Sequence, residues 1–184
     1  MNNATALQSL LNSPGIIPMP GVFDPISSRL AERAGFKAAF MSGFMVAAAR
    51  IGMPDTGLIS YTEMLDQGRN LLDAVSIPVI GDGDTGWGNA INIKRTVKGY
   101  AAAGFACIML EDQLAPKRCG HTQGKQVVGR AEASARFRAA VDARDEVRAA
   151  GGDILIMART DANASQGLEE AMEVAADEPR PALG

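Results

Sequence analysis

Apolar and polar positions along this chain follow two patterns. Short apolar runs, typical of buried β-strands, lie at residues 16–23, 37–41, 77–81, 106–110 and 154–158. Between them, apolar residues that repeat on one helical face predict helices at residues 26–34, 61–74, 89–103 and 131–150. Because the strand-like runs are continuous rather than alternating with polar residues, we predict a parallel sheet covered by helices.

Polar side chains gather where each predicted strand ends. The groups, in chain order, are Asp24, then Ser42 with Gly43, then Asp82 with Asp84, then Glu111 with Asp112, and finally Arg159 with Thr160 and Asp161. In a parallel barrel these ends share one face, which is the face where catalytic sites are built. Open doubly wound sheets also bind ligands at the carboxyl ends of their strands, so this pattern alone does not choose the fold.

Composition narrows the function classes. The chain has 184 residues, which is enough for a single domain over residues 1–184, and its net charge of -3 argues against a general nucleic-acid binder. No apolar run has membrane-spanning length, and the first residues lack the pattern of a secretory signal. Two cysteines do not form a disulfide framework. We therefore expect a cytoplasmic protein without a membrane or nucleic-acid partner.

The most informative segment is IPVIGDGDTGWG at residues 77–88, where a strand leads into Asp82 and Asp84. It formally matches a dinucleotide-binding loop, but its two acids would repel a pyrophosphate. An EF-hand is excluded because the twelfth position counted from Asp82 is Ile93. Glu111 recurs at the next strand end, so three carboxylates are expected to converge and to bind Mg²⁺, with Mn²⁺ as an alternative. The plainer interpretation is an acidic turn with solvated carboxylates.

A long polar connection follows the fourth predicted strand. Residues 112–130 have the length and glycine content of an active-site lid. The segment carries Cys119 and His121, the chain's only histidine, together with the basic residues Lys117, Arg118 and Lys125. A basic setting favours a thiolate, which makes Cys119 a candidate acid or base. The alternative is a solvated basic loop with an incidental cysteine.

Three weaker signals have ordinary alternatives. Arg159 ends an apolar strand and needs either a ligand carboxylate or an internal acid as its partner. The turn at residues 42–44 could present backbone N–H groups to an oxyanion, although taken alone it fits an ordinary turn better. Asp55 could face the site or cap a turn.

Taken together, these motifs resemble the isocitrate lyase and phosphoenolpyruvate mutase superfamily. The resemblance runs from PMPGVFDPISSRLAERAGF at residues 18–36 to ARTDA at 158–162, with SGF, GDGDTGWG, EDQ and KRCGH between them in order. The KRCGH segment is similar to the carbon–carbon lyase branch, which includes methylisocitrate lyase and 2,3-dimethylmalate lyase. The resemblance implies a TIM (β/α)8 barrel, of which about five strand–helix units are present here. We therefore expect an incomplete, C-terminally truncated barrel with an irregular tail at residues 177–184.

The resemblance also implies a role for each motif residue. Asp82 and Asp84 would bind Mg²⁺, with Glu111 supporting it through water, and Asp55 would lie beside the metal end of the pocket. Cys119 would protonate the carbanion left after cleavage, on a lid that includes Lys117 and Arg118. Substrate binding would fall to Ser42, Gly43 and Phe44 at the keto-acid end, to Gly120 and His121 at the departing carboxylate, and to Arg159.

The activity implied is a Mg²⁺-dependent carbon–carbon lyase that cleaves a 2-hydroxy di- or tricarboxylate to an α-keto acid and a carboxylate. Substrates of the 2-methylisocitrate or 2,3-dimethylmalate kind fit this description. Oxaloacetate decarboxylation or hydrolysis on the same scaffold is an alternative, and so is a non-catalytic fragment. Members of the superfamily form homotetramers that exchange a last helix, and we expect that helix to be missing here.

Overall fold

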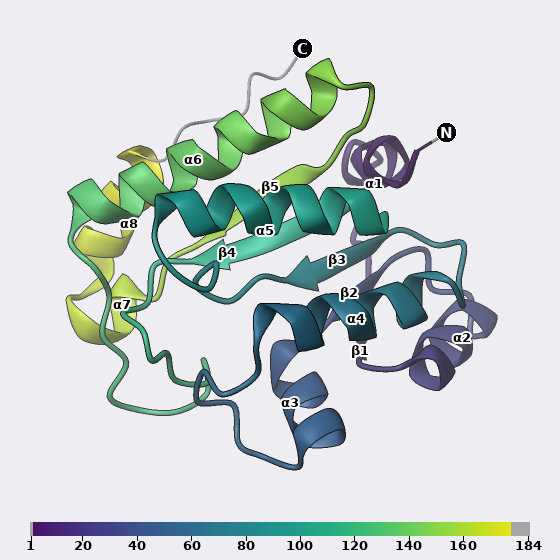
Figure 1. The fold of residues 1–184 in the computed structure, drawn as a ribbon, viewed down its shortest axis with the longest axis horizontal. Helices are drawn as coiled ribbons and strands as arrows, with labels where there is room; N and C mark the ends of the chain where they lie inside the picture. Colours follow the sequence, from purple (N-terminus) through teal and green to yellow (C-terminus); the bar gives the residue numbers. More distant parts are fainter. Residues whose placement is uncertain (1, 178–184) are drawn as a thin grey trace.

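A computed structural model describes residues 2–177 of the chain (Figure 1). Its centre is a parallel sheet with the strand order β1-β2-β3-β4-β5, which confirms the predicted parallel sheet. The strands are β1 (Gly21–Val22), β2 (Ala39–Met41), β3 (Val79–Asp82), β4 (Cys107–Glu111) and β5 (Leu155–Arg159). The tail predicted at residues 177–184 lies outside the described residues, except for Asp177 at the end of a helix.

Helices connect the strands. They are α1 (Asn3–Leu11), α2 (Pro25–Arg33), α3 (Gly43–Ile51), α4 (Tyr61–Leu72), α5 (Ala90–Ala103), α6 (Arg130–Ala149), α7 (Ala162–Ser165) and α8 (Leu168–Asp177). The four helices predicted from periodicity correspond to α2, α4, α5 and α6, with ends that differ by one or two residues. Each strand except the last described one is therefore followed by at least one helix that returns the chain to the next parallel strand.

Two local expectations were wrong. The first strand covers only Gly21–Val22 instead of residues 16–23, because Pro18 and Pro20 have no N–H to donate to a ladder. The segment after Ser42 is the helix α3 rather than a simple turn. Ser42 caps this helix by accepting the Met45 N–H at 3.4 Å.

The larger buried cluster lies between the sheet and the helices on its outer face. Val79 and Ile108 of the strands belong to it together with Val97 of α5 and Phe137 of α6. Figure 1 shows α5 and α6 running side by side along the sheet. The smaller cluster, on the other face, joins Ile80 to Leu7 of α1. The sheet therefore has one face covered by helices and an inner face that α1 covers in part.

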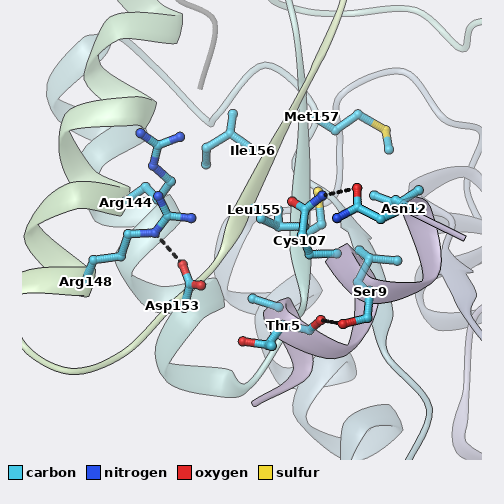
Figure 2. A pocket seen from close by; sticks show the side chains of 14 residues that line it. Thr5, Ser9, Asn12, Cys107, Arg144, Arg148, Asp153, Leu155, Ile156 and Met157 are labelled. Atoms are coloured by element: carbon cyan, nitrogen blue, oxygen red, sulfur yellow. Dashed lines mark hydrogen bonds and ion pairs between the residues drawn. The ribbon is translucent and has the colours of Figure 1, made fainter. Parts of the chain in front are cut away.

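The sheet has two open edges, because among the described residues β1 and β5 each have one strand neighbour. A cavity of about 620 Å³ lies beside the β5 edge. Figure 2 shows its walls, with Thr5 and Ser9 of α1 and the C-cap residue Asn12 on one side and Arg148 and Asp153 on the other. Within residues 2–177, no helix combines the length and the apolar character needed to cross a membrane.

Candidate active site

The parallel register brings the predicted strand-end residues to one end of the sheet. Asp82 ends β3, Glu111 ends β4 and Arg159 ends β5. Glu111 and Arg159 are directly paired in the β4–β5 register, and Arg159 Nη1 lies 3.1 Å from Glu111 Oε2. Tyr100, buried in the core, donates its hydroxyl to the Asp82 carbonyl oxygen at 2.8 Å and so fixes the end of β3.

Backbone N–H groups hold the carboxylate of Asp82. Its Oδ2 accepts the Gly43 N–H at 3.0 Å, and its Oδ1 accepts the Asp84 N–H at 3.0 Å. Gly43 begins α3, and a helix N-terminus favours an anion. A Cβ on Gly43 would lie 2.9 Å from Asp82 Oδ2, so only glycine allows this approach. The Gly43 amide is thus engaged within the protein rather than open to a substrate.

Lys117 lies between two buried aspartates. Its Nζ is 2.5 Å from Asp55 Oδ1 and 2.7 Å from Asp84 Oδ1, and all three side chains are buried. Asp84 has a φ of 45°, a left-handed conformation that costs a non-glycine residue about 1–3 kcal/mol and is common at functional sites. The predicted lid residue Lys117 therefore supplies a counter-ion to the carboxylate group.

The site holds more negative than positive charge. Four neighbouring acids form what we call the carboxylate cluster: Asp55, Asp82, Asp84 and Glu111. The positively charged side chains that face this cluster are Lys117 and Arg159. Burial, followed by the charge of Asp82, raises the pKa of Asp84 to about 7 against the lowering effect of Lys117. Burial raises the pKa of Glu111 to about 8, although Arg159 opposes the shift. If all four acids are ionised, two negative charges remain uncompensated, which equals the charge of one divalent cation.

The oxygens that remain free fit such an ion. Asp84 Oδ2 and Glu111 Oε1 are buried, and no hydrogen-bond donor among the described residues reaches them. Asp84 Oδ1 also makes no hydrogen bond of good geometry with the described residues, but the ammonium of Lys117 compensates its charge. No set of three or more His, Cys, Asp or Glu within residues 2–177 is arranged to hold an ion by itself. The donor set therefore suits a hard cation that keeps several waters, as Mg²⁺ does.

Cys119 is buried beside His121, with 3.6 Å between Sγ and Nδ1. Each basic side chain near this thiol in the sequence has another partner, so the basic setting expected for Cys119 stays a prediction. Lys117 bonds the carboxylate cluster, and Lys125 bonds Asp161 at 3.1 Å. The guanidinium of the exposed Arg118 donates to the Gln123 carbonyl oxygen at 3.5 Å. Among the described residues, the imidazole of His121 is the side chain within hydrogen-bonding distance of Sγ.

The connection between β4 and α6, residues 112–129, is fixed by a buried amide that the sequence analysis missed. Gln113 donates to the Arg118 carbonyl at 3.0 Å and accepts the Arg118 N–H at 2.9 Å. The same amide donates to Asp161 Oδ2 at 3.0 Å. Asp161 also binds Lys125 and Arg159, so one carboxylate links the connection to the end of β5. We call residues 112–129 the β4–α6 loop.

Residues from the strand ends and from the β4–α6 loop line a cavity of about 370 Å³. Its lining is Phe40, Ser42, Phe44, Asp55, Asp82, Met109, Lys117, Cys119, Gly120, His121 and Arg159. Nine of these were predicted as site residues, whereas Phe40 and Met109 were missed because they are apolar strand residues. A second cavity, of about 830 Å³ and mostly apolar, shares several of these residues and extends to Arg118. Gly43, Asp84 and Glu111 are not part of either lining.

Gly120 brings the β4–α6 loop against Arg159. A Cβ at this position would lie 2.4 Å from Arg159 Nη2, so the absence of a side chain permits the contact. Arg159 Nη2 also lies 2.9 Å from Asp161 Oδ2. The internal-acid alternative for Arg159 is thus realised by Glu111 and Asp161, while the guanidinium still faces the cavity.

A comparison with protein families matches a range that includes the strand ends and the loop. The model of the family described as phosphoenolpyruvate phosphomutase matches residues 7–177. The chain belongs to the phosphoenolpyruvate mutase/isocitrate lyase superfamily. The resemblance inferred from the motifs is thereby confirmed, and so is the TIM-barrel class of which this parallel sheet is a part.

Two curated relatives within this superfamily are lyases. The chain is 42% identical to 2,3-dimethylmalate lyase of Eubacterium barkeri over 173 residues, which is 94% of this chain and 58% of that protein. It is also 42% identical to 2-methylisocitrate lyase of Aeropyrum pernix over 167 residues, covering 91% of this chain and 52% of that protein. The chain thus spans little more than half the length of these relatives.

Solved structures show the same partial coverage. Oxaloacetate acetylhydrolase in complex with 3,3-difluorooxalacetate superposes with a TM-score of 0.91 at 41% identity, covering 96% of this chain and 59% of that one. A phosphonopyruvate hydrolase in complex with oxalate and Mg²⁺ gives a TM-score of 0.84 at 32% identity, again covering 96% and 59%. The chain therefore corresponds to somewhat more than half of each of these structures.

Proposed function

We propose that this chain carries the metal- and substrate-binding part of a Mg²⁺-dependent carbon–carbon lyase. Its substrate would be a 2-hydroxy di- or tricarboxylate of the 2,3-dimethylmalate or 2-methylisocitrate kind, cleaved to an α-keto acid and a carboxylate. The observation that carries this proposal is the buried carboxylate cluster with its excess negative charge, at the wall of a cavity that also holds Arg159 and Cys119. The lyase activity of the two curated relatives supports it.

The free oxygens of Asp84 and Glu111, together with Asp82, would hold the ion, with water completing its shell. When bound, Mg²⁺ supplies Lewis-acid polarisation of the substrate's 2-hydroxy acid end. A structural relative that is named as a complex with oxalate and Mg²⁺ supports the choice of ion. The Gly43 and Asp84 N–H groups keep Asp82 oriented for this task.

Arg159 would bind a substrate carboxylate, because its guanidinium faces the cavity and is already held in place by Glu111 and Asp161. Gly120 and His121, which line the same cavity, would contact the departing carboxylate. Ser42 and Phe44, at the start of α3, also line the cavity and would contact the keto-acid end. Because the Gly43 amide is bound to Asp82, this end relies on Ser42 and Phe44 rather than on all three residues.

Cleavage in retro-aldol fashion requires two proton transfers. The 2-hydroxyl loses its proton as the C–C bond breaks, and we assign this proton to Asp55, a cavity-lining carboxylate without the backbone donors that hold Asp82. The electron pair of the broken bond passes to the departing fragment as an enediolate. Cys119 would then protonate that carbon, and His121, at 3.6 Å from Sγ, is placed to return a proton to the thiolate.

The test is turnover of 2,3-dimethylmalate and 2-methylisocitrate by the purified chain, with Mg²⁺ and with EDTA. We expect keto acid to form only with Mg²⁺ and to fall by 100-fold or more in Cys119→Ser, about the contribution of one acid–base group. Cys107→Ser is the matched control, because Cys107 is buried at the other end of β4 and is absent from the cavity lining. Keto acid formation that is equal in EDTA, or no formation from either substrate, would contradict the proposal.

Hydrolytic cleavage of oxaloacetate is the second candidate. The superposition on oxaloacetate acetylhydrolase favours it. This candidate predicts oxalate and acetate from oxaloacetate. Equal conversion of oxaloacetate by Cys119→Ser and wild type, without cleavage of the 2-hydroxy acids, would select an oxaloacetate-cleaving enzyme over the lyase.

A further inference from the structure

The second cavity of the site, of about 830 Å³, has walls of a different kind from the first. Phe44, Pro54 and Pro116 give it apolar surface, and Phe44 is 49% exposed. Arg159 and Gly120, to which we assign substrate carboxylates, line the first cavity and not the second. The first cavity therefore offers a cation to a ligand, whereas the second offers mainly apolar contact.

The basic side chains of the second cavity are engaged elsewhere. The Lys117 ammonium is bonded to two carboxylates of the cluster. Arg118 lines the cavity, but its Nη1 donates to the Gln123 carbonyl oxygen at 3.5 Å and would lie 3.3 Å from a Cβ on Gly124. Since Gln123 and Gly124 are not part of the lining, the guanidinium lies beside residues outside the cavity. A carboxylate in the second cavity would thus lose hydration without gaining an uncompensated cation from the described lining residues.

Cys119 and His121 line both cavities and so mark the place where the two cavities join. In the proposed reaction Cys119 protonates the carbon of the departing fragment, which puts this carbon at the junction. The carbon, C3 of the substrate, carries a carboxylate, which the first cavity binds, and one further substituent. That further substituent has the second cavity in front of it.

We propose that the second cavity is an alkyl subsite, which selects 2-hydroxy dicarboxylates with an alkyl group on C3 over tricarboxylates. This inference rests on the proposed function, because the proton transfer from Cys119 defines the position of C3. Phe44, Pro54 and Pro116 contact a methyl or a longer alkyl group, which gains by leaving water. A carboxymethyl group at the same carbon, as in 2-methylisocitrate, is disfavoured. The subsite thus decides between the two kinds of substrate.

Inert analogues without the 2-hydroxyl group test the preference by calorimetry in the presence of Mg²⁺. The probes are 2,3-dimethylsuccinate, 2-ethyl-3-methylsuccinate, and the tricarboxylate in which carboxymethyl replaces the ethyl group. The ethyl compound should bind about four-fold more tightly than the dimethyl compound, which is the gain for one buried CH₂. It should bind roughly ten-fold or more tightly than the tricarboxylate. Equal affinities of the ethyl compound and the tricarboxylate, or no binding of any probe, would overturn the inference.

A charge placed in the second cavity should reverse this order. Thr56 is exposed and lines the cavity, so Thr56→Lys adds an ammonium there and should raise the affinity for the tricarboxylate to at least that for the ethyl compound. Thr62→Lys is the matched control, because Thr62 is exposed on α4 and lies outside both linings. Relative affinities in Thr56→Lys equal to those of the control would overturn the subsite. Tight binding of the tricarboxylate to wild type that is lost in Arg118→Met would also overturn it.

Turnover separates this inference from the proposed function. The inference expects a kcat/KM for 2,3-dimethylmalate roughly ten-fold or more above that for 2-methylisocitrate. Cleavage of both with equal kcat/KM would overturn the inference and leave the proposed function standing. Cleavage of neither would overturn the proposed function, while the affinities of the inert analogues would still decide whether the second cavity prefers an alkyl group.

Discussion

At the scale of single residues, the site depends on close approaches that particular side chains permit. Gly43 lets the Asp82 carboxylate reach the first N–H groups of α3, and Gly120 lets the loop reach Arg159. The sequence predicted the acids because they follow apolar strands. It could not predict that Lys117 pairs with Asp55 and Asp84, because those partners come from distant segments.

Gly43→Ala should displace Asp82. The added Cβ would lie 2.9 Å from Oδ2, so the carboxylate or the start of α3 must move and the Gly43 hydrogen bond is lost. We expect a loss of about 1–3 kcal/mol in the free energy of unfolding, measured with urea, together with weaker Mg²⁺ binding. Gly129→Ala is the control, because a Cβ there meets nothing within 4 Å. Equal losses of stability in the two variants would show that the contact between Gly43 and the Asp82 carboxylate is not tight.

The two thiols should differ in reactivity. Burial raises the pKa of Cys107 to about 12, so its reactive thiolate is scarce at pH 8 and increases only as the pH approaches that value. Both thiols are buried and each lines a cavity, Cys119 those of the site and Cys107 the one beside β5, so the raised pKa of Cys107 decides the difference. Iodoacetamide at pH 8 should therefore modify Cys119 first, as read by peptide mass spectrometry, and both thiols should react in urea. Preferential labelling of Cys107 in the folded protein would contradict this placement.

At the scale of elements, apolar runs predicted five strands in the right order, since burial on both faces leaves a strong sequence signal. The predicted start of β1 was wrong because prolines cannot donate to a strand ladder, whatever the apolar pattern. The helix α3 was missed because residues 42–44 suggested a turn. The β4–α6 loop was predicted as a lid from its length and glycines, and that role stays a prediction. Its anchor, Gln113, could not be inferred, because a buried amide has no periodicity to reveal it.

Gln113→Leu should loosen the β4–α6 loop without unfolding the sheet. The change removes both bonds to the Arg118 backbone and leaves those groups, and Asp161 Oδ2, short of a partner. A loss of about 1–3 kcal/mol in local loop stability follows, seen as faster tryptic cleavage at Arg118. Gln126→Leu serves as control, because its side chain is exposed and makes no bond among the described residues. Equal cleavage in the two variants would remove Gln113 as the anchor.

At the scale of the whole molecule, the parallel sheet formed by residues 2–177 has two open edges within that range, which present unpaired backbone groups at β1 and β5. Exposed apolar side chains, Ile16 and Ile26, lie near the β1 edge. We expect the purified chain to associate with itself as its concentration rises, as read by light scattering after size-exclusion chromatography. A monomer over a wide concentration range, with one sharp thermal transition, would contradict this expectation.

The central claim is that the carboxylate cluster needs a divalent cation. Calorimetric titration of Mg²⁺ into the folded chain tests it most directly, with Asp84→Asn as the variant and Asp153→Asn, an acid at the other end of β5, as the control. The account predicts one Mg²⁺ per chain in the wild type and control, and at least ten-fold weaker binding in Asp84→Asn. Folded wild-type protein that takes up neither Mg²⁺ nor Mn²⁺ would contradict it.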